Sequence, residues 1–261
     1  MKPTGWLHRE GLRLALHESG HGPAFVFQHG LCGDAAQAAE ACPPGFHRLS
    51  LECRGHGQSD AGQSYSIASF ADDVAAVIEN IGTPVILGGI SMGAAIATRI
   101  AVTKPHLVSA LALIRPAWIA AAAPANLAPC AEVGRLIAAH QPAGTFATPT
   151  SPDNHASLTS FFARPQPSTA ALLTQIAADG PGIAESDIAA LKMPTVVMGC
   201  AEDFIHPLRL AHRLASLIPG AGFVDLPPKG RDKPAHIAAL HAALTQFLKD
   251  ACHAPSRHEL A

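Results

Sequence analysis

The sequence of 261 residues lacks any long hydrophobic run. No stretch supplies the roughly 18 uninterrupted apolar residues that a membrane-spanning helix needs. The alanine-rich run 117–131 comes nearest, but Pro124 and Pro129 interrupt it. Residues 1–16 contain no sustained apolar segment of the kind that a secretory signal has. We therefore expect a cytoplasmic protein that does not enter a membrane.

Charged and aromatic residues are also scarce. Charged residues make up 15% of the chain and aromatic residues 5%, whereas hydrophobic residues make up 48%. This composition is typical of one compact globular domain. The 18 basic and 20 acidic residues give a formal net charge of −2. A balance this even argues against nucleic acid or an anionic membrane as a partner.

Motifs for metals, phosphates and disulfides are missing or lack the required context. The six cysteines include no C-x-x-C pair, so we expect reduced thiols. There is no G-x-x-x-x-G-K phosphate loop, and the histidines show no supported ligand spacing. His17-Glu18-Ser19-Gly20-His21 matches H-E-x-x-H, but that zinc motif requires a helix. Gly20, Gly22 and Pro23 disfavour a helix, so we expect a turn between strands here and no metal or cofactor in the protein.

Short apolar strands alternate with helical patterns over most of the chain. This alternation predicts an α/β fold in which a mostly parallel central sheet is covered by helices on both faces. Residues 11–16 alternate polar and apolar side chains, as an edge strand or hairpin does. The remaining expected strands are 24–28, 46–51, 84–87, 108–114, 195–198 and 222–226, and the expected helices are 67–80, 91–102, 208–217 and 234–248.

The alternation lapses in the middle of the chain. Residues 117–186 are rich in proline and alanine, with helical patches only at 131–139 and 169–178. We predict a helical cap at 117–186, inserted into a core formed by residues 1–116 and 187–250. Residues 251–261 are expected to form a frayed tail.

The clearest chemical motif is Gly89-Ile90-Ser91-Met92-Gly93, a match to G-x-S-x-G. It follows a predicted strand and opens a predicted helix, which is the context in which this motif presents a nucleophile. The tight turn strains the serine backbone and requires small flanking residues. The start of the helix also places the amide of Met92 beside Ser91. We predict that Ser91 is a nucleophile; the alternative is an ordinary glycine-rich turn.

A serine nucleophile needs a base to remove its proton and an acid to orient that base. Asp203 follows the strand predicted at 195–198. Because parallel strands end at a common rim, its carboxylate is expected near Ser91. We therefore predict Asp203 as the acid, with neighbouring Glu202 or a solvated loop carboxylate as alternatives.

The base is expected late in the chain. His236 comes ten residues after Leu226, in the loop or first turn that leads to the last helix. His241 is expected within that helix, facing away from the rim. His236 is therefore the predicted base, and His206 ranks behind it.

Four segments together resemble the α/β-hydrolase superfamily, in the branch of small esterases, enol-lactonases and cofactor-free haloperoxidases. The resemblance covers about residues 20–116 and 190–248, and it implies an oxyanion hole formed by the amides of Leu31 and Met92. The four segments are His29-Gly30-Leu31-Cys32-Gly33, Arg54-Gly55-His56-Gly57-Gln58-Ser59, the serine turn, and Asp203-x-x-x-Pro207.

The chain departs from that family pattern at two places. Glu52 stands two residues before Arg54, where the family usually has aspartate, and this change is expected to affect structure and not chemistry. The family's histidine normally belongs to a Gly-His pair soon after the last strand. Here the loop 227–235 precedes His236 instead.

Residues near the expected rim are candidates for substrate binding. Arg115 and Trp118 follow the strand 108–114, where the cap begins. Arg115 could bind a substrate carboxylate with two hydrogen bonds, and Trp118 could wall the pocket. The alternatives are a structural salt bridge and a packed indole. His29 is a third candidate.

The sequence thus predicts a serine hydrolase that cleaves a small, anionic or polar ester or lactone through an acyl-enzyme. A C–C bond hydrolase, a perhydrolase or haloperoxidase with the same triad, and a non-catalytic small-molecule sensor are the alternatives. The only partner that we expect is the small-molecule substrate, and a homodimer is compatible with the sequence.

Overall fold

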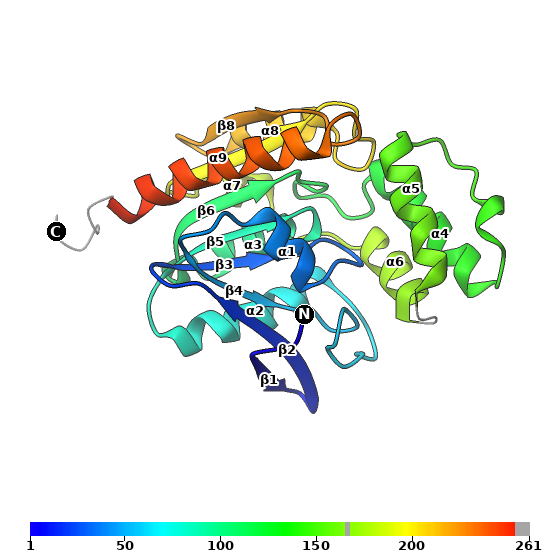
Figure 1. Ribbon diagram of the computed structural model, residues 1–261, viewed down its shortest axis with the longest axis horizontal. Helices are drawn as coiled ribbons and strands as arrows, with labels where there is room; N and C mark the ends of the chain where they lie inside the picture. Colours follow the sequence, from blue (N-terminus) through cyan, green and yellow to red (C-terminus); the bar gives the residue numbers. More distant parts are fainter. Residues whose placement is uncertain (165–167, 254–261) are drawn as a thin grey trace.

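The computed structural model describes residues 1–164 and 168–253 (Figure 1). Its centre is an eight-stranded sheet in the order β1-β2-β4-β3-β5-β6-β7-β8. The strands are β1 (Gly5–Arg9), β2 (Leu12–Ser19), β3 (Ala24–Gln28), β4 (His47–Leu51), β5 (Val85–Ile90), β6 (Val108–Ile114), β7 (Thr195–Cys200) and β8 (Gly222–Leu226).

The sheet is mostly parallel, as predicted. β4, β3, β5, β6, β7 and β8 run parallel, while β2 pairs antiparallel with both β1 and β4. β5 and β7 are buried along their whole length, which explains why they read as continuous apolar runs. Residues 12–16 belong to β2, which forms a hairpin with β1. Strand β1 was not predicted, and it forms one edge of the sheet.

Helices cover both faces of the sheet. Helices α1 and α9 share one buried apolar cluster with Phe25 and Phe27 of β3. Helices α2, α3 and α8 pack in the other cluster, which includes Val26. The bounds are α1 (Ala35–Ala41), α2 (Ile67–Ile81), α3 (Met92–Thr103), α8 (Leu208–Leu217) and α9 (Lys233–His253), with a short 3-10 turn η1 (Pro105–Leu107) before β6.

A helical insertion, α4–α6, lies between β6 and β7 and projects beside the sheet (Figure 1). The sequence patches at 131–139 and 169–178 correspond to α4 (Ala128–Ala138) and α6 (Ser168–Ala178), which pack together. Helix α5 (Pro152–Ser160) was not predicted, because its sequence is polar and buries only Asn154 and Leu158. The other elements here are η2 (Ala125–Leu127), η3 (Ala143–Thr145), η4 (Phe161–Ala163) and α7 (Glu185–Ala189), which contacts α3 and α8.

The predicted tail falls largely outside the described residues. Residues 251–253 continue α9, and 254–261 are not described. None of the helices in the described ranges is long and apolar enough to cross a membrane.

The H-E-x-x-H match does not form a helix. His17, Glu18 and Ser19 end β2, so the expected turn begins only at Gly20, whose φ is 82°. The side chain of His17 is buried, whereas His21 is exposed. Across residues 1–164 and 168–253, no group of three or more histidine, cysteine or carboxylate side chains could hold a metal ion.

The six cysteines are free thiols, five of them buried. Burial raises the pKa of Cys32 and Cys130 to about 12 in each case. These thiols therefore stay protonated at neutral pH and behave as small apolar side chains.

Candidate active site

Ser91 lies on a sharp turn between β5 and α3. Its φ of 58° and ψ of −114° belong to a strained conformation that few non-glycine residues adopt. A Cβ at Gly89 would collide with the backbone of Gly93, and a Cβ at Gly93 would collide with the carbonyl group of Gln28. The two glycines are therefore required for the turn to pack, as the G-x-S-x-G motif predicts.

The partner of the Ser91 hydroxyl is His206. The Oγ atom of Ser91 lies 2.8 Å from Nε2 of His206. Nδ1 of His206 lies 2.9 Å from Oδ2 of Asp203, and the backbone amide of His206 donates to Oδ1 of the same carboxylate over 3.1 Å. Serine, histidine and aspartate thus form a continuous chain, in which acid and base come from one loop after β7.

The prediction that His236 faces Ser91 is wrong. His236 lies in the first turn of α9, where it is buried, and its Nδ1 donates to the carbonyl oxygen of Pro227 over 2.8 Å. That bond occupies the ring nitrogen that would have to face the acid of a triad. His241, in the same helix, contacts the carbonyl oxygen of Glu40 through Nε2.

The loop 227–235 after β8 contains no Gly-His pair. Its glycine, Gly230, is followed by Arg231, whose Nε lies 2.7 Å from Oε2 of Glu202. Glu202, the alternative acid, is thus in an exposed ion pair and does not face Ser91. Histidine comes instead from position 206, one residue before Pro207.

Arg115 contacts the carboxylate of Asp203. Its side chain is buried, and its Nε lies 2.9 Å from Oδ2 of Asp203, which Nη2 also contacts. Nη2 further approaches Nδ1 of His206 to 3.2 Å. We place the Nδ1 proton toward Asp203, because that contact is shorter and because only this tautomer lets Nε2 accept the Ser91 proton. Arg115 thus forms the structural salt bridge that was the alternative to substrate binding, and its partner is Asp203.

The charges around Ser91, His206 and Asp203 favour a neutral imidazole beside a charged carboxylate. Burial alone would raise the pKa of Asp203, but His206 and Arg115 hold it well below its ordinary value. Burial lowers the pKa of His206, and the positive charge of Arg115 lowers it further, against the opposing effect of Asp203. At neutral pH, Asp203 is therefore charged and His206 is neutral, so that Nε2 can accept a proton.

The two residues of the predicted oxyanion hole lie at the start of α3 and in the loop after β3. Met92 is the first residue of α3, where backbone amides have no acceptor within the helix. In the loop after β3, the amide of Gly30 donates to Oε1 of Gln37 over 2.6 Å, and that of Cys32 donates to Nε2 of His56 over 3.0 Å. Leu31 lies between them, and no acceptor for its amide is found within the described part of the chain.

His29 supports this loop and does not face the cavity, which corrects its prediction as a substrate-binding residue. Its ring is fully buried. Nδ1 donates to the carbonyl oxygen of Gly30 over 2.8 Å, and Nε2 accepts the amide proton of Cys53 over 3.0 Å. Burial lowers the pKa of His29, so the ring is neutral at neutral pH, which this bonding pattern requires.

A small cavity of about 120 Å³ opens beside Ser91 and His206. Trp118 lines it as predicted, with its indole Nε1 donating to the carbonyl oxygen of Asp179 over 3.0 Å. Lys229 also lines it, and its Nζ lies 3.2 Å from Oδ2 of Asp153. The remaining walls are mainly apolar and come from Leu31, Ile90, Leu127, Leu158, Phe161 and Ile205.

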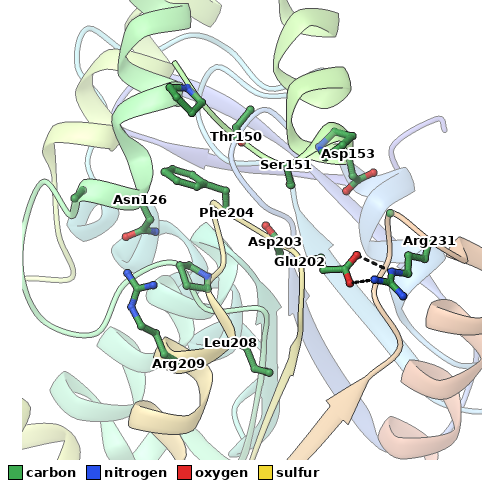
Figure 2. A pocket seen from close by; sticks show the side chains of 15 residues that line it. Asn126, Thr150, Ser151, Asp153, Glu202, Asp203, Phe204, Leu208, Arg209 and Arg231 are labelled. Atoms are coloured by element: carbon green, nitrogen blue, oxygen red, sulfur yellow. Dashed lines mark hydrogen bonds and ion pairs between the residues drawn. The ribbon is translucent and has the colours of Figure 1, made fainter. Parts of the chain in front are cut away.

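A larger cleft of about 890 Å³ is lined in part by the loop that follows β7 (Figure 2). Asp203, Phe204, Asn126 and Arg209 are among its lining residues. The cleft lacks Ser91 and His206 among its lining residues, so the smaller cavity is the candidate for the reacting group.

The pairing of His206 with Ser91 and the buried Asn126 and Asn154, which bond to the His206 loop, were not predicted from the sequence. One signal for His206 was present, because the Gly-His pair is absent and a histidine directly precedes Pro207 in the acid's own loop. No sequence signal pointed to the two asparagines, because the cap has no motif of its own.

Comparison with known proteins agrees with this architecture. Residues 23–231 match the family model described as alpha/beta hydrolase fold. Among curated proteins, the chain is 39% identical over 105 residues to an (E)-2-((N-methylformamido)methylene)succinate hydrolase of Acinetobacter baylyi, which covers 37% of this chain and 39% of that protein. It is 35% identical over 96 residues to a protein named "Putative esterase/lipase" from Haemophilus influenzae, which covers 35% of this chain and 33% of that protein. These matches thus span little more than a third of the relatives' length.

Solved structures extend the similarity over nearly the whole chain. An alpha/beta hydrolase from a Medee basin deep-sea metagenome has a TM-score of 0.77 at 16% identity, with 94% of this chain and 97% of that chain covered. The enol-lactonase of Burkholderia xenovorans has a TM-score of 0.69 at 21% identity, with 94% and 100% covered. At these identities the likeness shows the fold alone. Together with the match over residues 23–231, it establishes that the chain belongs to the alpha/beta hydrolase fold family.

Proposed function

We propose that the protein is a serine hydrolase that cleaves a small carboxylic ester or lactone, with Ser91 as nucleophile, His206 as base and Asp203 as the orienting acid. The observation that carries this proposal is the 2.8 Å approach of Ser91 Oγ to His206 Nε2, with Asp203 on the opposite ring nitrogen. The family relationship and the fold shared with an enol-lactonase support the same class of reaction.

In the first half of the reaction, His206 Nε2 accepts the Ser91 proton while Oγ attacks the substrate carbonyl carbon. The carbonyl oxygen becomes an oxyanion, which the amides of Leu31 and Met92 stabilise by about 3–4 kcal/mol per donor in comparable sites. The imidazolium, stabilised by Asp203, then gives its proton to the leaving alkoxide oxygen as the ester bond breaks. Ser91 remains acylated.

Water completes the cycle. His206 Nε2 removes a proton from a water molecule, whose oxygen attacks the acyl carbon. The second oxyanion collapses, the bond to Ser91 Oγ breaks, and the proton on His206 returns to Oγ. The products are a carboxylic acid and an alcohol or, from a lactone, one hydroxy acid.

The shape of the small cavity favours a compact acyl group. At about 120 Å³ it is well below the roughly 300–1,000 Å³ of pockets that hold drug-sized ligands. Two cationic side chains line this cavity, Arg115, which pairs with Asp203, and Lys229, which pairs with Asp153 and could meet a polar or anionic substituent.

Labelling with a fluorophosphonate probe tests the proposal, because the probe reacts with activated serines. We expect the wild-type protein to be labelled and Ser91→Ala to remain unlabelled, while an exposed variant such as Ser216→Ala keeps wild-type labelling. An unlabelled wild-type protein would favour a non-catalytic sensor. A panel of esters, lactones, β-diketones and peracid-forming conditions would distinguish ester cleavage from C–C cleavage and perhydrolysis.

A further inference from the structure

The loop between β7 and α8 carries both the base and the acid of the candidate site. Asp203 and His206 are three residues apart, and α8 begins at Leu208, directly after Pro207. Any displacement of this short loop therefore moves Nε2 of His206 relative to Ser91, which is fixed on a different element. The contacts that hold the loop backbone in place decide whether the three groups line up.

Two asparagines from the segment between β6 and β7 provide such contacts. Oδ1 of Asn154, in α5, accepts the amide protons of Phe204 over 2.9 Å and of Ile205 over 3.1 Å. Nδ2 of Asn126, in η2, donates to the carbonyl oxygen of Ile205 over 2.6 Å and to that of Ala117 over 3.0 Å. The two residues between acid and base are thus bonded through their backbone to the cap.

These asparagines are unusual within the chain. The sequence has three asparagines, and the two that are buried, Asn126 and Asn154, both bond to this loop, whereas Asn80 is exposed at the end of α2. A buried amide side chain is stable only where its polar atoms have partners. Here those partners are backbone groups of the loop, and an apolar side chain of similar size would leave those groups unbonded.

The two asparagines line different cavities. Asn154 lines the small cavity beside Ser91, and Asn126 lines the larger cleft (Figure 2). Phe204, the residue next to the acid, points into that cleft with 41% of its surface exposed. The backbone amide of Phe204 is nevertheless held by Oδ1 of Asn154.

We propose that Asn126 and Asn154 are positioning residues, which together form a clasp that links the cap to the catalytic base. This inference rests on the proposed function and goes beyond it, because it assigns to the cap a role in aligning the triad in addition to any role in selecting the substrate. A shift of the cap that breaks the clasp removes His206 from Ser91, so the site is competent only when the cap is seated.

The two asparagines use opposite hydrogen-bonding groups, and one substitution therefore distinguishes them. Asparagine to aspartate keeps the shape and the acceptor oxygen Oδ1, and it replaces the donor amide group by a second acceptor oxygen. We expect Asn126→Asp to lower kcat by about 10- to 100-fold, because a small misplacement of a catalytic group has effects of this size. We expect Asn154→Asp to retain kcat to within about fivefold, and Asn154→Leu, which lacks the acceptor, to lose about as much as Asn126→Asp. Asn80→Asp is the matched control on the surface and keeps wild-type kinetics.

The readouts separate positioning from a merely structural role. In Asn126→Asp and Asn154→Leu, kcat and the rate of fluorophosphonate labelling should fall together while KM stays within about threefold of wild type. Hydrogen exchange at the amides of Phe204 and Ile205 should accelerate in Asn154→Leu and stay slow in Asn154→Asp. If Asn126→Asp does not fold, the two Asn154 variants provide the comparison.

The outcomes also separate this inference from the proposed function. Wild-type kcat in both Asn126→Asp and Asn154→Leu would overturn the clasp while leaving the hydrolase intact, and so would an equal loss of kcat in Asn154→Asp and Asn154→Leu. A wild-type protein without labelling or turnover would overturn the proposed function, and with it the catalytic meaning of the clasp.

Discussion

His206 and Asp203 form a hydrogen-bonded unit within a single turn of loop, and His206 reaches across 115 residues of sequence to the hydroxyl of Ser91. The positions of the His206 and Asp203 side chains are therefore determined by the backbone of one loop. In the arrangement expected from the sequence, base and acid come from two loops, after β7 and after β8. The consequences of this difference are measurable.

The acid should be Asp203 and not its neighbour. Asp203→Asn keeps the shape of the side chain but removes the charge that orients His206 and stabilises the imidazolium, so we expect kcat to fall by roughly 10³- to 10⁴-fold. Glu202→Gln is the matched control, since Glu202 pairs with exposed Arg231. Steady-state hydrolysis of a small ester measures both. Equal losses in the two variants would contradict the assignment.

The activity should require a neutral His206 and should be retained below the ordinary histidine pKa. Because burial and Arg115 lower the pKa of His206, we expect kcat/KM to decline with acidification only below about pH 6.5. Arg115→Met removes a positive charge beside the ring, so the acidic limb should move to higher pH.

A second arginine provides the control for this pH dependence. Arg231 is exposed and pairs with Glu202 of the same loop, so Arg231→Met should leave the limb in place. An acidic limb that moves equally in the two variants, or moves to lower pH in Arg115→Met, would count against the assigned role of Arg115.

The turn at Ser91 should tolerate no side chain at Gly93. In Gly93→Ala, the new methyl group meets the backbone of Gln28 and His29, so we expect a loss of about 1–3 kcal/mol in the free energy of unfolding, from overpacking. Labelling of Ser91 should fall as well, because the turn has to shift. Gly144→Ala, where a Cβ meets nothing within 4 Å, should be neutral. Denaturant unfolding checks both; a neutral Gly93→Ala would show that the turn is looser than described.

Acyl-group size should control turnover. The cavity of about 120 Å³ favours short acyl groups, so kcat/KM for p-nitrophenyl esters should decrease from butyrate to decanoate. Phe161→Ala should enlarge the cavity and shift the preference toward longer chains. Phe204→Ala serves as the control, because Phe204 faces the other cleft. A preference for long chains in the wild-type protein would mean that the cap opens further than the structure shows.

The sequence predicted the parts of the molecule that depend on local pattern. Buried parallel strands are continuous apolar runs, and the G-x-S-x-G turn has glycines where the backbone approaches closely, so the sheet and the position of Ser91 could be read directly. The carboxyl-end rule also placed Asp203 on the rim of the sheet. Each of these depends on residues close together in the sequence.

The choice between His206 and His236 depended on tertiary geometry. His236 fits the usual order along the chain, but its Nδ1 donates to Pro227, and Arg115 occupies Asp203. Neither contact has a local sequence signature. The sequence left two roles open for Arg115 for the same reason, because a rim arginine can face either a substrate or a neighbouring carboxylate. Helix α5 was missed because its polar sequence has little amphipathic pattern.

The most direct test compares two histidine variants of the 261-residue chain by their second-order rate constants for fluorophosphonate labelling. We expect His206→Ala to lose at least about 10³-fold, because Ser91 then has no proton acceptor, and His236→Ala to stay within about tenfold of wild type once unfolded protein is accounted for. The reverse pattern, with labelling retained in His206→Ala and abolished in folded His236→Ala, would contradict the account.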